Sequence, residues 1–393
     1  MANTSAAGRR SLPTDTPSLA VDELIDDRGV RVIVCCGSGG VGKTTTAAAL
    51  ALRAAERGRK VCVLTIDPAK RLAQSMGLVE LDNTPRTVRD IDDSAGGHLD
   101  AMMLDMKRTF DEIVEAHAEP ERSAAILENP FYQALSTSFA GTQEYMAMEK
   151  LGQLRETSET TGQWDLIVVD TPPSRSALDF LDAPKRLGSF LDGRLMRLLS
   201  APARGAGRFS ARVMTAGFGM VTGVMTKIIG AQVLKDLQTF VASFDALFGG
   251  FRARAEATFA QLQAPDTRFV VVAAPERDAL REASYFVERL ASEQMPLAGL
   301  ILNRVQRQSL PQLSASAALA GADRLDEHGD HPLTSGLLRL HADRAETATR
   351  QRRLAERFCG AHPRVPAASV AALAGDVHDL DGLREVGDLL ADQ

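Results

Sequence analysis

The sequence of 393 residues contains few cysteines and no long apolar run. None of its four cysteines, Cys35, Cys36, Cys62 and Cys359, forms a CxxC pair, which leaves no support for a zinc site or a redox motif. The longest charge-free helical segment, residues 213–226, falls short of the roughly 20 apolar residues that span a membrane. Because so few cysteines suit a reducing compartment, we expect a cytoplasmic protein.

The sequence also lacks an excess of charge of one sign. The net charge is −6, and acidic and basic residues are interspersed, so no nucleic-acid partner is expected. No apolar segment follows Arg9 and Arg10, which argues against a secretion signal. Residues 1–28 are rich in Ser, Thr, Ala, Pro and Asp, and we expect them to form a disordered tail.

One motif stands out against these absences. The apolar run Val32–Cys36 leads into a glycine-rich turn and then an alanine-rich helical pattern, the order that a phosphate-binding loop requires. Glycines let backbone N–H groups surround a phosphate, and the positive end of the next helix faces the same anion. The predicted nucleotide-binding residues of this loop are Gly37, Ser38, Gly39, Gly40, Val41, Gly42, Lys43, Thr44 and Thr45. Lys43 is expected to reach the β- and γ-phosphates of ATP, and the Thr44 hydroxyl to bind Mg²⁺.

Buried strands alternate with helices along most of the chain, which predicts an α/β fold with a doubly wound, mostly parallel sheet. The predicted strands are Val32–Cys36, Lys60–Ile66, His98–Leu104, Trp164–Asp170, Arg268–Ala273, Leu297–Leu302 and Val365–Val370. Only one phosphate loop and no internal repeat are present, so residues 29–393 are expected to form a single ATPase domain.

Two aspartates follow predicted strands at the edge where α/β sheets bind their ligands. Asp67 comes directly after Lys60–Ile66, and Pro68 prevents a simple continuation of that strand. Asp170 ends four apolar residues, a pattern in which the aspartate supports Mg²⁺ through water.

Helical parts are expected at about residues 106–160 and 184–262, where the alternation is interrupted. In the second part, apolar residues at helical spacing form one face: Met214, Phe218, Val221, Met225 and Ile228. A methionine-rich face suits an adaptable apolar groove for a client, because thioether side chains are flexible and polarisable. The pattern alone fits an ordinary helical subdomain packed on the sheet better than a groove.

Motifs along nearly the whole chain resemble those of the ArsA-type ATPases, a class with a deviant Walker A loop. The shared motifs are GSGGVGKTT, TIDPAKRLAQ, GTQE, VVDTPPSRSALDFL, APE and LNRV. The family includes arsenite-pump ATPases and guided-entry chaperone ATPases for tail-anchored membrane proteins. The sequence looks most like one of the paired, paralogous ArsA-like ATPases of actinobacteria.

The resemblance implies roles for particular residues. Asp67 would position the attacking water and could contact the metal, and Asp170 would support Mg²⁺ through water. Asn303 would hydrogen-bond adenine, and Pro275 and Glu276 would pack near the base.

The chain departs from the family pattern in three places. Ser38 replaces a lysine that crosses the dimer interface in the family, and a neutral serine cannot offset transition-state charge. Arg175 and Ser176 replace a glycine and a histidine of the second switch, and the zinc-binding CxxC pair is absent. The missing lysine predicts a heterodimer with a paralogous ArsA-like ATPase that carries it. Arg175 is one candidate to compensate instead.

We therefore expect an Mg-dependent ATP hydrolase that handles an apolar helical client or a membrane-protein partner. One alternative is the energising subunit of a metalloid or anion pump, but soft metalloids favour thiolate clusters, which the cysteine positions do not suggest. A second alternative is a positioning ATPase. Some of those dock on membranes through a basic C-terminal helix, whereas this chain ends in an acidic segment.

Overall fold

A computed structural model of the protein describes residues 12–13, 15–67, 71–130, 132–133, 136, 142–172, 253–254, 256–308, 310–329 and 331–392. The chain divides into two compact units. The first comprises residues 1–103, 157–178 and 262–393, and the second comprises residues 104–156 and 179–261.

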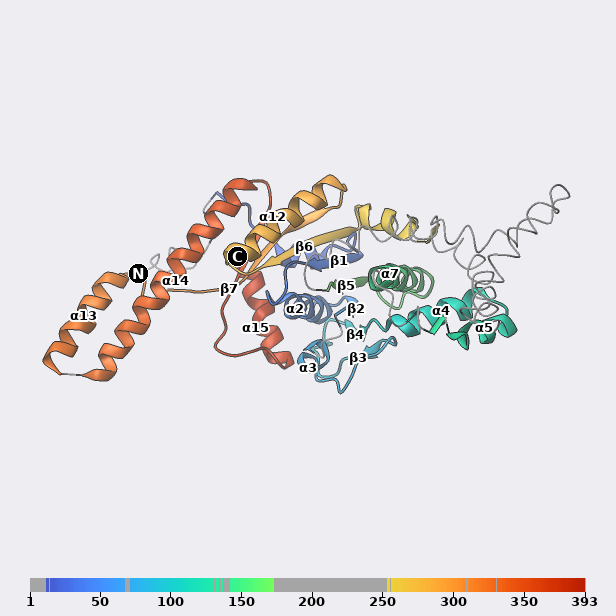
Figure 1. Cartoon of the computed structure of the whole chain (residues 1–393), viewed down its shortest axis with the longest axis horizontal. Helices are drawn as coiled ribbons and strands as arrows, with labels where there is room; N and C mark the ends of the chain where they lie inside the picture. The colour runs from blue at the N-terminus through green and yellow to red at the C-terminus, as the bar shows by residue number, and fades with distance from the viewer. Residues whose placement is uncertain are drawn as a thin grey trace, which may run out of the picture. The chain divides into compact units, whose positions relative to one another are not determined.

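The first unit is built on an eight-stranded sheet with the strand order β3-β4-β2-β5-β1-β6-β7-β8 (Figure 1). Its strands are β1 (Val32–Cys36), β2 (Lys60–Thr65), β3 (Arg86–Thr87), β4 (His98–Met103), β5 (Leu166–Asp170), β6 (Thr267–Ala273), β7 (Leu297–Val305) and β8 (Ala367–Ala371). β3 is antiparallel to β4, and the other pairings among the described strands are parallel. The predicted doubly wound, mostly parallel sheet is confirmed. The short strand β3 was not predicted.

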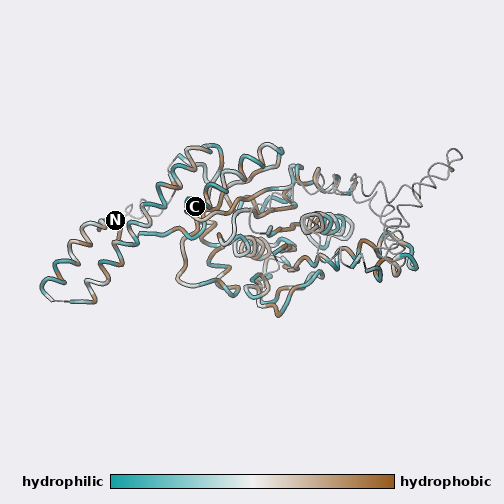
Figure 2. Tube along the Cα trace, in the orientation of Figure 1, coloured by the Kyte–Doolittle hydropathy of each residue, from teal (hydrophilic) through white to brown (hydrophobic). Residues whose placement is uncertain are grey.

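Helices cover both faces of the sheet because its strands are apolar on both faces. On one face, Ile33 and Cys35 of β1 belong to an apolar cluster with α2 (Lys43–Glu56) and α15 (Leu380–Ala391). Val34 and Cys36 alternate with them and are buried on the other face. The helix α12 (Arg277–Ser292) contacts β6 and β7 (Figure 1). Figure 2 shows apolar segments along the central strands, as expected for a sheet buried on both faces.

Two further helices form a hairpin between β7 and β8, and a short one, α3 (Arg71–Ser75), follows β2. In the hairpin α13 (Ala315–His328) lies beside α14 (Pro332–Ala361) (Figure 1). The polar, alanine-rich stretch from Pro311 to Asp330 predicts only a loop or weak helix, and the helix found there buries just Ala318 and Ala322. Its N-terminal end is nevertheless well formed, since the Ser314 side chain accepts a hydrogen bond from the backbone N–H of Ala317.

The expected disordered tail, residues 1–28, needs a correction, because its last third is ordered. The helix α1 (Val21–Asp26) buries Val21 and Ile25 against the sheet's apolar cluster. Just before it, the backbone N–H of Leu19 donates to the carbonyl of Ala367 in β8 over 3.1 Å. Composition predicted disorder because only a few apolar residues carry this packing.

Arg59 ties this N-terminal segment to the sheet. Its side chain is 1% exposed and donates hydrogen bonds to the carbonyls of Ile25, Asp27 and Val30. It also donates to the Asp165 carboxylate over 2.6 Å. A buried guanidinium is costly to desolvate, and here its N–H groups find acceptors on the segments that meet around it.

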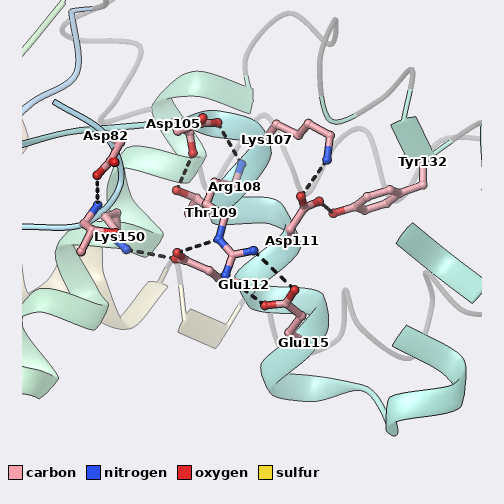
Figure 3. Close-up of polar contacts among 11 residues, drawn as sticks. Asp82, Asp105, Lys107, Arg108, Thr109, Asp111, Glu112, Glu115, Tyr132 and Lys150 are labelled. Atoms are coloured by element: carbon pink, nitrogen blue, oxygen red, sulfur yellow. Dashed lines mark hydrogen bonds and ion pairs between the residues drawn. The ribbon is translucent and has the colours of Figure 1, made fainter. Parts of the chain in front are cut away.

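The described residues of the second unit are mainly helical, in α4 (Met106–His117), α5 (Pro120–Leu127) and the first part of α7 (Thr142–Thr161). Figure 3 shows the polar contacts along α4, where the Glu112 carboxylate accepts from Lys150 of α7 over 3.0 Å. The sequence predicts a helix over Gly141–Gln153, and α7 continues beyond it to Thr161. The apolar face from Met214 to Ile228 lies outside the described residues. Within the described part of the chain, every helix is too short or too polar to cross a membrane.

We predict that Arg59→Ala lowers the free energy of unfolding by about 3 kcal/mol or more, because it leaves buried carbonyls without a donor. Arg57→Ala is the matched control: it removes a partly exposed guanidinium from ion pairs with Asp22 and Asp26, and we expect a loss below about 1 kcal/mol. Urea unfolding of both variants measures the difference. Equal losses would show that Arg59 does not hold the N-terminal segment.

Candidate nucleotide site

The glycine-rich turn connects β1 to α2 and has the backbone of a phosphate loop. Gly37 has φ 151°, and a Cβ there would lie 2.1 Å from the carbonyl oxygen of Val272. Gly42 has φ 90° and precedes the first residue of α2, and no side chain among the described residues caps the start of this helix. Glycine is therefore required at both positions, and the first N–H groups of α2 remain available to an anion.

Lys43, the first residue of α2, is buried and folded back on the loop. Its Nζ donates to the carbonyl oxygen of Ser38 over 2.8 Å. Burial lowers the pKa of Lys43, and the carboxylates of Asp170 and Asp67 act in the opposite direction. The ammonium thus lies inside the loop that the sequence assigned to the phosphates.

Asp170 is the buried centre of the site. Its Oδ2 accepts hydrogen bonds from Thr44 Oγ1 over 2.7 Å and from Thr65 Oγ1 over 2.9 Å. Its Oδ1 is buried and has no hydrogen-bond partner among the described residues. Burial raises the pKa of Asp170 to about 6, although the two hydroxyls and Lys43 lower it. A buried carboxylate with one unpartnered oxygen is costly in isolation, which points to a cationic ligand.

The residues present fit Mg²⁺. A hard cation favours oxygen ligands, and the Thr44 hydroxyl and the Asp170 carboxylate supply them side by side. Mg²⁺ commonly binds one or two protein groups and completes its shell with water and phosphate oxygens. In the described part of the chain, no cluster of three or more His, Cys, Asp or Glu residues could hold a metal.

Asp67 follows β2 and is joined to this centre through Thr65. The backbone N–H of Asp67 donates to Thr65 Oγ1 over 3.2 Å, and the same hydroxyl donates to Asp170. Residues 68–70, which follow Asp67 in the first switch, lie outside the described residues. Thr65 was not predicted as a site residue. Its position could have been inferred from the register of the sheet, because Thr65 in β2 pairs with Asp170 in β5.

Asn303 lies against the outside of the phosphate loop. Its Nδ2 donates to the carbonyl oxygen of Val41 over 2.8 Å, and its Oδ1 accepts from the backbone N–H of Arg304. A Cβ on Gly42 would lie 2.2 Å from the Asn303 Nδ2, so this approach also needs glycine in the loop. The adenine contact predicted for Asn303 stays a prediction.

A cavity of about 870 Å³ adjoins the start of α2 and is large enough for a nucleoside. Its lining includes Thr44, Thr45, Arg71, Gln74, Asn303, Arg304, the last two residues of β8 and residues 372–378 that follow it. Arg71, Gln74 and residues 371–378 were not predicted. The rule that flagged Asp67, a position just beyond the carboxyl end of a strand, would have flagged the segment after β8.

Pro275 and Glu276, predicted to pack near the base, are placed differently from Asn303. Pro275 lines a separate cavity of about 20 Å³ together with Leu302 and Val305. Neither Pro275 nor Glu276 is among the described residues that line the large cavity. Their part in base binding therefore stays a prediction.

The thiols near the site are buried. Cys35 and Cys36 lie in β1, and burial raises the pKa of Cys36 to about 12 and that of Cys35 well above its usual range. Cys62 is buried in β2. Since thiolates rather than thiols bind soft metalloids, Cys35 and Cys36 are unsuited to such a site at neutral pH.

Comparison with known proteins agrees with this geometry. Residues 30–317 match a family described as anion-transporting ATPase. The chain is 26% identical over 300 residues to the ATPase GET3 of Podospora anserina, covering 74% of this chain and 78% of that protein. It is 26% identical over 290 residues to the ATPase get3 of Schizosaccharomyces pombe, covering 72% and 76%. A 28% identical match to the ATPase GET3 of Malassezia globosa covers 48% of this chain and 50% of that protein.

The raised pKa of Asp170 predicts a pH dependence of stability. In the folded protein the pKa is about 6, against an ordinary value of 3.8, so between these values the folded state holds a proton that the unfolded chain has released. Stability due to this group is therefore largest below about pH 4 and is lost as the pH rises towards 6. We expect Asp170→Asn to be more stable than the wild type at pH 7, by on the order of 3 kcal/mol.

Urea unfolding without nucleotide or Mg²⁺, from pH 4 to pH 7, compares the two proteins. Other titrating groups are shared, so they cancel in the difference between the wild type and Asp170→Asn. A difference that stays constant over this range would contradict the buried, unpartnered carboxylate.

Proposed function

The chain belongs to the anion-transporting ATPase family and is an ATP hydrolase, and on that premise we propose that it uses Mg²⁺-ATP turnover in the cytosol to handle an apolar helical client or a membrane-protein partner. The observation that carries the nucleotide part is the buried Asp170 carboxylate, bonded to Thr44 of the phosphate-loop helix and to Thr65 beside Asp67. The client part rests on the resemblance to guided-entry chaperone ATPases.

In this proposal the site residues have separate roles. The loop amides and the Lys43 ammonium would hold the β- and γ-phosphates. Thr44 would hold Mg²⁺ directly and Asp170 through water, and the metal would offset charge that develops on the phosphates. Asp67 orients the attacking water in line with the γ-phosphate. A carboxylate beyond a strand end can do so because it faces the ligand edge of the sheet.

Turnover would reach the client through the two segments that follow Asp67 and Asp170. The Thr65 hydroxyl forms hydrogen bonds with both the Asp170 carboxylate and the backbone N–H of Asp67. A movement of one aspartate would therefore alter the position of the other. The segment after Asp170 continues directly into residues 179–261 of the second unit. Ordering both segments on ATP and releasing them after hydrolysis is a known way to switch a distant surface.

The metalloid-pump alternative is less well supported. It needs thiolates, whereas Cys35, Cys36 and Cys62 are buried in strands of the sheet, and Cys359, the remaining cysteine of the chain, lies in α14. Burial raises the pKa of the Cys35 and Cys36 thiols. Arsenite addition should therefore leave the ATPase rate of this chain unchanged.

The client groove is tested on the predicted apolar face. Exchanging Phe218 and Met225 for Ser should reduce capture of an apolar helical peptide by at least about tenfold, because two large apolar contacts are lost, while ATP hydrolysis is retained. The matched control exchanges the same two residues for Leu, which keeps the face apolar. Peptide crosslinking and melting temperature are measured together. A large fall in melting temperature with no specific capture defect would assign these residues to the core.

We further propose that the working assembly is a heterodimer with a paralogous ATPase. Ser38 stands where the resembled family has a lysine that reaches the partner's phosphates. The Ser38 side chain is buried, and its hydroxyl has no hydrogen-bond partner among the described residues. Arg175, the candidate to compensate for the lysine, lies outside the described residues. A paralogue with the lysine would complete the site on this chain.

ATPase rates of this chain, alone and mixed with the suspected paralogue, test the assembly. The mixture should exceed the sum of the separate rates by at least about tenfold, since one cation at the transferred phosphate is worth that or more. Ser38→Lys should raise the rate of this chain alone, whereas Ser38→Gln, a neutral control of similar length, should not. A robust rate from this chain alone, insensitive to Ser38→Lys and to the paralogue, would rule the heterodimer out.

A further inference from the structure

The end of β7 contains an irregularity that faces the phosphate loop. The pairing of β7 with β8 shifts register between Leu302 and Val305, so residues 303 and 304 bulge out of the ladder. Arg304 has φ 60°, a left-handed backbone that an arginine rarely adopts. Bulges beside functional sites commonly redirect side chains, and a strained residue persists there because its surroundings hold it.

This bulge directs two adjacent side chains at two adjacent carbonyls of the loop. Asn303 Nδ2 donates to the Val41 carbonyl over 2.8 Å, and Arg304 Nη1 donates to the Gly40 carbonyl over 2.9 Å. The backbone N–H of Arg304 donates to Asn303 Oδ1 over 2.9 Å and orients the Asn303 amide. The left-handed turn at Arg304 is thus part of the same arrangement.

Fixing these two carbonyls also fixes the direction of the backbone N–H groups that follow them in the loop. Each peptide unit is planar, so the N–H that follows a fixed carbonyl points the opposite way. A phosphate loop works because successive N–H groups converge on the phosphates. The Arg304 guanidinium also adds a positive charge on the outer side of the loop.

We propose that Arg304 is a positioning residue for ATP turnover: it fixes the Gly40 carbonyl, and with it the phosphate loop, in the conformation that binds the β-phosphate. Asn303 does the same for the next carbonyl. Arg304 does not act on the reacting atoms, and it is distinct from the residues assigned to the phosphates, the metal and the water.

Arg304 also lines the large cavity, so it could contact the nucleoside instead. Comparing the binding of nucleotides that have a β-phosphate with the binding of one that lacks it separates these two roles. We expect Arg304→Ala to weaken binding of ATP and ADP by about tenfold, the effect of losing one hydrogen bond from a charged donor. AMP affinity should change by less than about twofold, since AMP lacks the β-phosphate that the loop holds. Competition with a fluorescent ATP analogue measures all three.

Two further variants separate the side chain from the backbone. Arg304→Gly removes the guanidinium but relieves the left-handed backbone, so it should lose ATP and ADP affinity like Arg304→Ala and keep the wild-type melting temperature. Arg307→Ala removes the same charge from an exposed arginine three residues along and should leave all affinities unchanged.

The proposal fails if Arg304→Gly binds ATP like the wild type, which would assign the effect to backbone strain alone. It also fails if AMP affinity falls as far as ADP affinity, which would place Arg304 on the nucleoside, or if Arg304→Ala has no effect. Should Arg304→Ala lose its fold, the comparison of Arg304→Gly with Arg307→Ala gives the same decision.

Discussion

Two threonine hydroxyls that meet on one buried carboxylate hold the nucleotide site of this protein together. Thr44 lies in the first turn of the phosphate-loop helix, Thr65 ends β2 and Asp170 ends β5, so their two hydrogen bonds join three elements at one edge of the sheet. The parallel register of β2 and β5 makes the meeting possible, because it sets Thr65 directly beside Asp170. The carboxylate remains strained electrostatically: it is fully buried, one oxygen has no described partner, and its pKa is raised. A site built in this way favours a bound cation over none.

The parts of the fold that the sequence predicted are those with strong local signals. The β1–loop–α2 unit follows from an apolar run, glycines and an alanine-rich helix, and the later strands follow from short apolar runs between turns. The short helix α1 was missed because its burial rests on isolated apolar residues whose partners lie far away in the chain. The helix α13 was predicted only as a loop or weak helix, since few of its residues are apolar and it packs mainly on the neighbouring α14. Composition reports on a segment alone, whereas the ordering of α1 depends on Arg59 and on an edge strand formed from residues 367–371.

The same distinction applies to the site. Lys43, Thr44 and Asp170 were predicted from motifs, and the structure brings Thr44 and Asp170 within hydrogen-bond distance. Thr65 was missed because its role depends on the register between β2 and β5, and Arg304 was missed because its role depends on a bulge in β7. Neither feature can be predicted from a local sequence pattern. Pro275 lies at a separate small cavity. A resemblance between motifs assigns a role to a position in the sequence, but it does not determine where the side chain lies in the fold. The adenine contacts and the client-binding face remain predictions for the same reason.

In the proposed mechanism the two strand-end aspartates have different roles in ATP turnover: Asp170 supports the metal, and Asp67 orients the water. The most direct measurement combines nucleotide affinity with single-turnover hydrolysis for Asp67→Asn and, as a reference, Lys43→Ala. Asp67→Asn should bind ATP within about threefold of the wild type but hydrolyse it at least about 100-fold more slowly, because the side chain keeps its shape while the acceptor for the water is weakened. Lys43→Ala should lose both binding and hydrolysis. Full single-turnover activity in Asp67→Asn would contradict the claim.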